Sequence, residues 1–200
     1  MKKKIIVLTS LFLILILGGC GAKTEGEIDN MKFKETEEIT NYVKIEMTTG
    51  DLMILELYPN TAPITVENFQ KLVSEKFYDN LIFHRVIEDF MIQGGDPQGT
   101  GMGGSNNTIK GEFESNGVAN NLKHERGVIS MARSQIKDSA SSQFFICHKD
   151  ASYLDGDYAA FGKLIAGFDT LDKIATTKVN GEKPVTDQKM KTVRFVTIEK

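Results

Sequence analysis

The segment FHRVIEDFMIQGGDP, residues 83–97, places charged and polar side chains among large apolar ones. His84, Arg85 and Asp96 are the charged candidates, and Gln93 adds an amide. The segment contains no serine, threonine or cysteine that could act as a nucleophile. An active site built from it would therefore work through a fixed cation on an apolar floor, without a covalent intermediate.

Other site chemistries find weaker support in the sequence. The three histidines, His84, His124 and His148, lack the clustered spacing of metal ligands, and the Asp-Gly-Asp segment at 155–157 is too short for a calcium loop. The glycine-rich segment 94–107 lacks the Gly-Lys-Ser/Thr ending of a phosphate-binding loop, so we expect a tight surface loop and no metal or cofactor. Spacing alone leaves Ser-His-Asp catalysis open, although no Gly-x-Ser-x-Gly motif is present.

The elements before this segment are a hairpin and a helix. Residues 42–47 and 52–57 are rich in β-formers and flank a Thr-Thr-Gly-Asp turn, which predicts a β-hairpin. Residues 61–79 change to helical spacing, with Pro63 suited to the first turn. The apolar face of this helix is expected to comprise Val66, Phe69, Leu72 and Val73.

The remainder of the chain predicts short strands separated by turn-rich loops. The expected strands are 82–86, 90–94, 128–131, 143–147, 160–165 and 192–199, with a second helix at 168–176. Many short strands with two helices indicate a mainly antiparallel barrel or sandwich. About 160 residues are enough for one domain with its own core.

The N-terminus has the features of an export signal. Three lysines precede an apolar run at 5–17, which is short for a membrane-spanning helix. The following Leu-Gly-Gly-Cys resembles a bacterial lipobox, which implies a signal peptide at 1–19 and lipidation of Cys20; the alternative is an uncleaved anchor at 5–17. Residues 20–40 predict a lipidated cysteine and flexible tether, and residues 41–200 a single domain.

Charge and cysteine content narrow the partners. Cleavage after residue 19 removes three lysines and no acids, which moves the formal charge from -3 to -6. An acidic chain is a poor ligand for nucleic acid. Lipidation of Cys20 leaves only Cys147, so no internal disulfide is expected, and its apolar surroundings predict a buried, inert thiol.

Four segments, in order and spacing, are similar to those of cyclophilins, the peptidyl-prolyl cis-trans isomerases. They are FHRVIEDFMIQGGDPQGTGMGG, GVISMAR, SASSQFFIC and YLDGDYAAFGKLIAG, and the likeness extends from about residue 42 to the C-terminus. With the lipobox, the chain resembles a bacterial surface lipoprotein form of that family. The resemblance implies a mainly β fold, a closed eight-stranded antiparallel β-barrel capped by two α-helices.

The resemblance also assigns roles to residues. Arg85 matches the catalytic arginine, which donates a hydrogen bond to the proline nitrogen of a twisted amide; its charged, rigid guanidinium suits this task. His84 beside it is expected to be a structural hydrogen-bonding residue. The implied substrate-binding residues are Phe90, Met91, Gln93, Gly101, Ala132, Arg133, Gln143, Phe145, Tyr153, Leu154 and Tyr158.

Three of these positions differ from common members of the family. Tyr153 stands where many eukaryotic members have tryptophan, and Tyr158 where they have histidine. Tyrosine keeps an aromatic wall, so turnover is expected, but loss of the indole donor predicts weak binding of cyclosporin. Arg133, where many members have asparagine, adds positive charge beside the peptide path.

The resulting hypothesis is a monomeric, lipid-anchored prolyl isomerase on the extracytoplasmic face of the cell membrane. Its expected substrates are exported polypeptides that contain proline, whose folding it would assist. The rival hypotheses are a binding module of the same fold, such as a chaperone or adhesin, and a structural cell-surface protein. The set formed by Arg85, Phe90, Met91, Gln93 and Phe145 favours the enzyme, because a binder needs no cation beneath the proline nitrogen.

Overall fold

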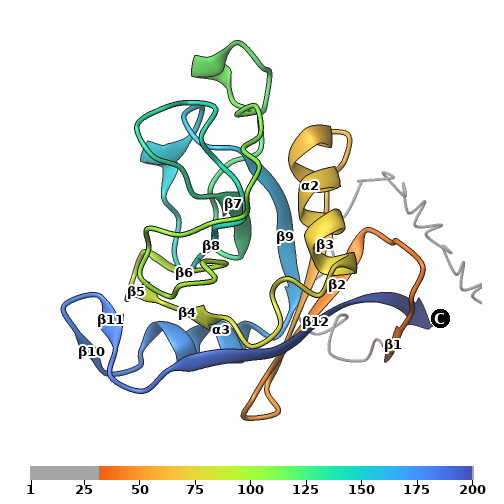
Figure 1. Ribbon diagram of the computed structural model, residues 1–200, viewed down its shortest axis with the longest axis vertical. Helices are drawn as coiled ribbons and strands as arrows, with labels where there is room; N and C mark the ends of the chain where they lie inside the picture. The colour runs from red at the N-terminus through yellow and green to blue at the C-terminus, as the bar shows by residue number, and fades with distance from the viewer. Residues whose placement is uncertain (1–31, 200) are drawn as a thin grey trace, which may run out of the picture.

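The computed structural model describes residues 32–199, which are mainly β-structure with two α-helices (Figure 1). The helices are α2 (Pro63–Ser74) and α3 (Phe168–Ala175), and Glu114–Asn116 and Ser152–Leu154 form single 3₁₀ turns. The strands are β1 (Lys32–Glu35), β2 (Tyr42–Met47), β3 (Leu52–Leu57), β4 (Ile82–Phe83), β5 (Arg85–Ile87), β6 (Met91–Gly94), β7 (Val128–Met131), β8 (Phe144–Cys147), β9 (Ala160–Ala166), β10 (Val179–Asn180), β11 (Lys183–Pro184) and β12 (Gln188–Glu199).

The predicted hairpin is confirmed as β2 and β3, which pair antiparallel. In β2, every second residue is buried, so Val43, Ile45 and Met47 point into the core, as the period of a half-buried strand requires. The long strand β12 has three partners along its length. Its first residues pair with β4, its middle with β2 and its last residues with β1. The C-terminal strand thereby ties the two ends of the described chain together.

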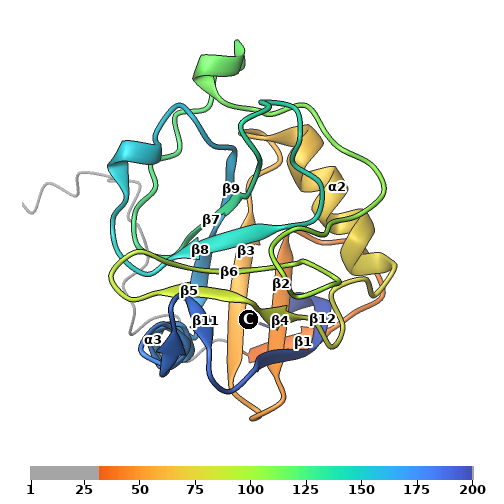
Figure 2. The same cartoon turned by 60° about the vertical axis from the view of Figure 1, so that its left-hand side comes forward.

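The sheet differs from the expected closed eight-stranded barrel. Nine strands follow the order β1-β12-β2-β3-β9-β7-β8-β6-β5, and a tenth, β4, pairs with β12 off this path, so the path has two ends. The sheet stays open because the predicted strand 82–86 is divided at His84 into β4 and β5. Within residues 32–199, β4 pairs with β12 and β5 with β6, but no ladder joins β4 to β5. Figure 2 shows β5, β6 and β8 crossing over β9, β3 and β2.

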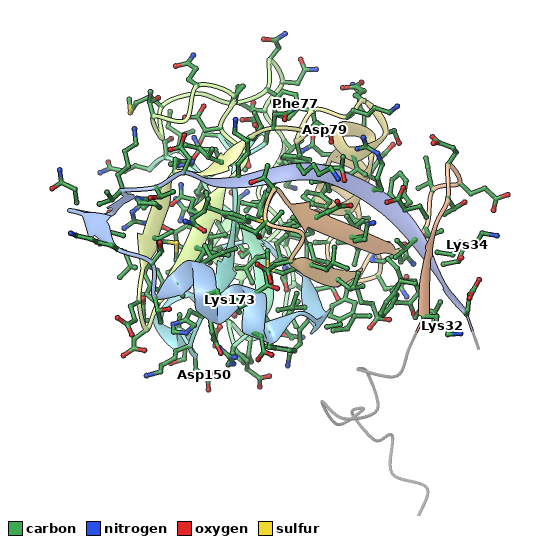
Figure 3. All side chains as sticks on the ribbon, turned by 90° about the horizontal axis from the view of Figure 1, so that it is seen from below. Lys32, Lys34, Phe77, Asp79, Asp150 and Lys173 are labelled. Atoms are coloured by element: carbon green, nitrogen blue, oxygen red, sulfur yellow. The ribbon has the colours of Figure 1, made fainter. Side chains whose placement is uncertain are left out.

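The N-terminal boundary of the folded region also needs correction. Residues 32–35, predicted to belong to the tether, form β1, in which Phe33 lies opposite Ile198 of β12. Lys32 and Lys34 project at the outer edge of the molecule (Figure 3), where charged side chains discourage pairing with another chain. The expected signal peptide and Cys20 lie outside the described residues.

Both predicted helices are present. The buried face of α2 includes all four apolar residues predicted for it, and Pro63 occupies its first turn. The Glu112 carboxylate accepts the backbone N–H groups of Ile64 and Thr65 at 3.1 and 2.7 Å, so a remote acid serves the N-terminus that Ala62 cannot cap. No helix within residues 32–199 has the length and apolar content needed to cross a membrane.

The apolar side chains form two separate clusters. The main core lies between α2 and the sheet, where the rings of Phe69, Tyr78, Phe144 and Phe161 pack together with centroids 5.1–5.6 Å apart. A smaller cluster on the other face of β6 and β8 contains Met91, Phe145, Cys147, Ala151 and Leu154. The second cluster is the floor of the candidate site.

Candidate active site

Strand register aligns three of the predicted site residues. Arg85 of β5 lies opposite Gln93 of β6, and Gln93 lies opposite Phe145 of β8. Directly opposed residues in an antiparallel ladder project from the same face of the sheet. The cation, the amide and the aromatic ring are therefore brought into one row by backbone pairing.

Hydrogen bonds link the polar members of this row to the glycine-rich loop. Arg85 Nη1 donates to Gln93 Oε1 at 3.2 Å, and Gln93 Nε2 donates to Gln143 Oε1 at 2.8 Å. Gln143 Nε2 in turn donates to the carbonyl oxygens of Gly101 and Gly103, at 3.0 and 2.7 Å. This continuous relay fixes the rotamers of both glutamines and orients the guanidinium.

A pocket opens beside the row. Its floor consists of Met91, Phe145 and Leu154, all buried, and Phe90 forms part of its wall. The complete lining is Arg85, Phe90, Met91, Gln93, Ala132, Arg133, Phe145, Leu154 and Tyr158. An apolar floor with a few convergent polar groups at the rim is the usual form of a small-ligand site.

Arg133 and Tyr158 form part of the pocket wall. The Arg133 guanidinium carbon lies 4.5 Å from the centroid of the Tyr158 ring and 5.0 Å from that of Phe113. Its Nε and Nη2 donate to the Asp157 carbonyl at 3.1 and 2.8 Å. Tyr158 meets Phe145 edge-on at 5.9 Å, which closes one side of the pocket.

A second groove continues from the pocket along the glycine-rich loop. Gly101, Gln143, Ala132 and Arg133 line it, so two predicted residues, Gly101 and Gln143, lie in the groove and not in the apolar pocket. The loop is held by buried Asp96, whose carboxylate accepts the N–H groups of residues 98, 100 and 101. Burial raises the pKa of Asp96, but these hydrogen bonds outweigh it and lower the pKa below its usual value.

Tyr153 occupies a different place from the other predicted residues. It is 69% exposed and lies outside the pocket lining, with its ring centroid 5.6 Å from that of Phe90. Tyr153 thus extends the aromatic rim of the pocket, where a long or bulky ligand would reach it.

A Ser-His-Asp arrangement does exist in the fold. The two ring nitrogens of His124 lie 3.0 Å from Asp155 Oδ1 and 3.0 Å from Ser130 Oγ. Ser130 is fully buried, and the His124 ring stacks behind Phe145 with centroids 6.0 Å apart. A serine sealed from substrate cannot act as a nucleophile, so this group supports the pocket floor from behind.

Cys147 and His84, two side chains near the pocket, were also the subject of predictions. Cys147 is fully buried, and burial raises the pKa of its thiol to about 12, which confirms an inert cysteine. His84 was expected to form structural hydrogen bonds, and this stays a prediction: both ring nitrogens are buried and neither has a partner of good geometry among residues 32–199, although the nearby Gln143 side chain acts to raise the pKa of His84. Burial lowers the pKa of His84, and its Nε2 faces Gly101, where an added Cβ would lie 3.6 Å away.

An acidic residue that contacts Arg85 was not predicted from the sequence. Glu182 lies between β10 and β11, and its carboxylate pairs with Arg85 at 2.5 Å. Nearly one hundred residues separate the two, and an exposed Gly-Glu-Lys segment carries no sequence signal for such a contact.

Comparison with known proteins places the fold and this pocket in a family. The model of the cyclophilin type peptidyl-prolyl cis-trans isomerase family matches residues 42–195. The chain belongs to this family. The match covers every residue of the pocket and of the adjoining groove.

Relatives of this cyclophilin come from bacteria and eukaryotes. Peptidyl-prolyl cis-trans isomerase B of Bacillus subtilis is 48% identical over 130 residues, 65% of this chain and 86% of that protein. A peptidyl-prolyl cis-trans isomerase of Helicobacter pylori is 45% identical over 151 residues, 74% of this chain and 88% of that protein. The chain spans only 27% of two Cryptococcus neoformans relatives named peptidyl-prolyl cis-trans isomerase-like 2, at 42% identity. Together these relatives support isomerase activity.

A solved structure agrees with the fold. A cyclophilin type isomerase of Cryptosporidium parvum, crystallised in the presence of the dipeptide Ala-Pro, is 35% identical with a TM-score of 0.70. The alignment covers 76% of this chain and 97% of that one.

Proposed function

We propose that this chain catalyses cis-trans rotation about X-Pro peptide bonds in the pocket lined by side chains of β5, β6 and β8. The observation that carries the proposal is the position of Arg85, held by Gln93 at the rim of an apolar floor formed by Met91 and Phe145. A proline ring fits the floor, and the preceding amide then lies beside the guanidinium. The Ala-Pro dipeptide used with the C. parvum relative has this chemistry.

The mechanism follows from the barrier to rotation. Amide resonance opposes rotation with about 18–20 kcal/mol. In the twisted state the proline nitrogen becomes pyramidal and regains a lone pair, which an N–H of Arg85 can meet with a hydrogen bond. Because the planar ground state offers no such lone pair, this interaction stabilises the transition state selectively. The relay through Gln93 and Gln143 means that the donor is already oriented when the substrate arrives.

The remaining predicted residues would bind the peptide. Phe90, Met91, Phe145 and Leu154 would hold the proline ring, with Tyr158 as a wall. The strand segment at Ala132 and Arg133, together with Gly101 and Gln143, would receive the residues before proline in the adjoining groove. Tyr153 would touch only long or bulky ligands such as cyclosporin, and weak cyclosporin binding is part of the proposal.

The decisive experiment is Arg85→Ala, measured as kcat/KM on a proline tetrapeptide by a protease-coupled or NMR exchange assay. Loss of one transition-state donor should lower kcat/KM about 10²- to 10³-fold. The unfolding free energy should change little, because Arg85 is half-exposed at the rim. Wild-type turnover by the variant would refute the mechanism, and peptide binding without turnover by the wild-type chain would favour the binding module.

The proposed setting is the outer face of the cell membrane, where a monomer anchored through Cys20 assists the folding of exported proteins. The basis is the N-terminal sequence alone. Cys20→Ser should release the protein from the membrane fraction and leave kcat/KM unchanged. Membrane association that persists in this variant would indicate an uncleaved anchor at 5–17.

A further inference from the structure

A small hairpin lies against the edge strand that carries Arg85. Strands β10 and β11 enclose Gly181 and Glu182, and Figures 1 and 2 both show β11 beside β5. The Val86 N–H donates to the Glu182 carbonyl oxygen at 2.7 Å. Because this bond uses only backbone atoms, replacing the Glu182 side chain leaves the hairpin docked.

The Glu182 side chain contacts the guanidinium of Arg85 at two points. Arg85 Nε donates to Oε2 at 2.5 Å, and Nη2 donates to Oε1 at 3.4 Å. A carboxylate that meets two nitrogens of one guanidinium fixes the plane of the fork as well as its position. The side chains are 36% and 53% exposed, so water screens the charge of the pair.

The donors of Arg85 can be counted. A guanidinium has five N–H groups, of which Glu182 takes one on Nε and one on Nη2, while Gln93 takes one on Nη1. One N–H on Nη1 and one on Nη2 remain. Both belong to the nitrogens at the far end of the side chain, which is the end that reaches a bound amide.

We propose that Glu182 is a positioning residue, which holds the Arg85 guanidinium so that its two remaining N–H groups face the pocket. The inference rests on the proposed role of Arg85. Gln93 restrains one nitrogen, Nη1, and the Glu182 contacts through Nε and Nη2 limit the rotation that a single hydrogen bond still permits. Because water screens the exposed pair, Glu182 orients the fork without cancelling the charge that the twisted amide needs.

The test compares Glu182→Ala and Glu182→Gln with the wild type in the full chain. Glu182→Ala should lower kcat about 3- to 5-fold, the scale of one exposed ion pair, with KM nearly unchanged. Glu182→Gln keeps one acceptor oxygen and should lose less. Glu125→Ala is the matched control, because Glu125 forms an ion pair of similar exposure with Lys163 outside the pocket lining; it should match the wild type.

A pH profile gives a readout that a purely structural role would not change. Its hydrogen bond with Arg85 lowers the pKa of Glu182 below 4.5. Arg85 of β5 is the charged group in contact with it, and Lys183 follows in β11. The ion pair therefore persists above that lowered pKa and is lost as the pH falls through it. The wild-type advantage over Glu182→Gln should disappear in the same range; an advantage that persists would overturn the proposal.

Variants in the Arg85→Ala background separate the two proposals. If Arg85→Ala is slow and adding Glu182→Ala causes no further loss, Glu182 acts through Arg85. If Arg85→Ala is slow but Glu182→Ala alone matches or exceeds the wild type, the positioning role is refuted and the role of Arg85 stands. An equal loss from Glu182→Ala in both backgrounds also refutes positioning. Wild-type activity in Arg85→Ala refutes the proposed mechanism itself.

Discussion

Phe144 and Phe145 are neighbours on β8, but they belong to different parts of the molecule. Phe144 is fully buried and packs edge-on against Phe69 and Tyr78 in the main core. Phe145 projects from the opposite face of the strand into the pocket floor. The same residue type therefore fills the main core at one position and lines the pocket at the next, because successive side chains of a strand point to opposite faces.

The difference extends across the neighbouring strands. On β6, Ile92 joins the main core, while Met91 and Gln93 face the pocket. Phe145 is closed from behind by the polar group around His124, whereas Phe144 is surrounded by apolar side chains. Around Phe144 the main core is formed by apolar and aromatic contacts, whereas the pocket floor is backed by the buried hydrogen bonds of His124.

The largest expected effect is the loss of stability when Phe144, the core residue of the Phe144–Phe145 pair, is truncated. Phe144→Ala should lower the free energy of unfolding by about 3–5 kcal/mol, because the cavity is enclosed by aromatic rings on several sides. Urea unfolding monitored by circular dichroism measures the change. A loss no greater than that of Phe145→Ala would contradict the division into two regions.

Phe145→Ala should act mainly on catalysis. The proline ring would lose its principal apolar contact, worth about 1.5–3 kcal/mol, so kcat/KM should fall about 10- to 100-fold. The unfolding free energy should fall by only about 1–2 kcal/mol, since one side of the ring already borders the pocket and is not packed against core side chains. The tetrapeptide assay and urea unfolding should be run on the same sample.

Acid should lower the stability of the fold through two buried histidines near the pocket, His84 and His124. Burial is the main cause that lowers the pKa of both His84 and His124 below 6.5. As the pH falls below 6.5, the unfolded chain binds protons that the folded chain does not, so stability is lost down to the lowered folded pKa. The limit is about 1.4 kcal/mol per pH unit for each histidine.

Urea unfolding at pH values from 7.5 to 5 measures this dependence. His124→Gln should reduce the slope, because one of the two groups no longer titrates. A slope unchanged in both His124→Gln and His84→Gln would show that neither histidine is responsible.

The smallest expected effect is at the rim. Tyr153→Trp should tighten inhibition by cyclosporin by about 1 kcal/mol, or roughly 5-fold, because the indole adds one donor at an exposed position. Turnover of a tetrapeptide should change less, since Tyr153 lies outside the pocket lining. Inhibition constants and kcat/KM measured side by side test this. Equal inhibition of both proteins would show that Tyr153 does not weaken cyclosporin binding, and Tyr158 and Arg133 would be tested next.

Local patterns predicted most of the elements. The hairpin, both helices and the strands at 128–131, 144–147 and 160–166 follow from alternation and helical spacing, which depend only on nearby residues. The break at His84 was missed because an unbroken β-rich run gives no sign that its two halves pair with different strands. Strand β1 was missed because a charged segment becomes a strand only when β12 offers it a partner.

The sequence was sufficient to predict the hairpin, both helices, the family and the residues of the pocket lining, since motif order and side-chain periodicity are properties of the chain itself. The tertiary structure alone decided how the sheet ends, the two faces of β8 and the contacts that orient Arg85. Gln93 was placed in the site by the family resemblance, and it lies only eight residues from Arg85 across one hairpin. Glu182 could not be predicted, because its contact depends on how a distant hairpin docks on β5, and long-range pairing is set by the packing of the whole sheet and leaves no periodic signal in the chain.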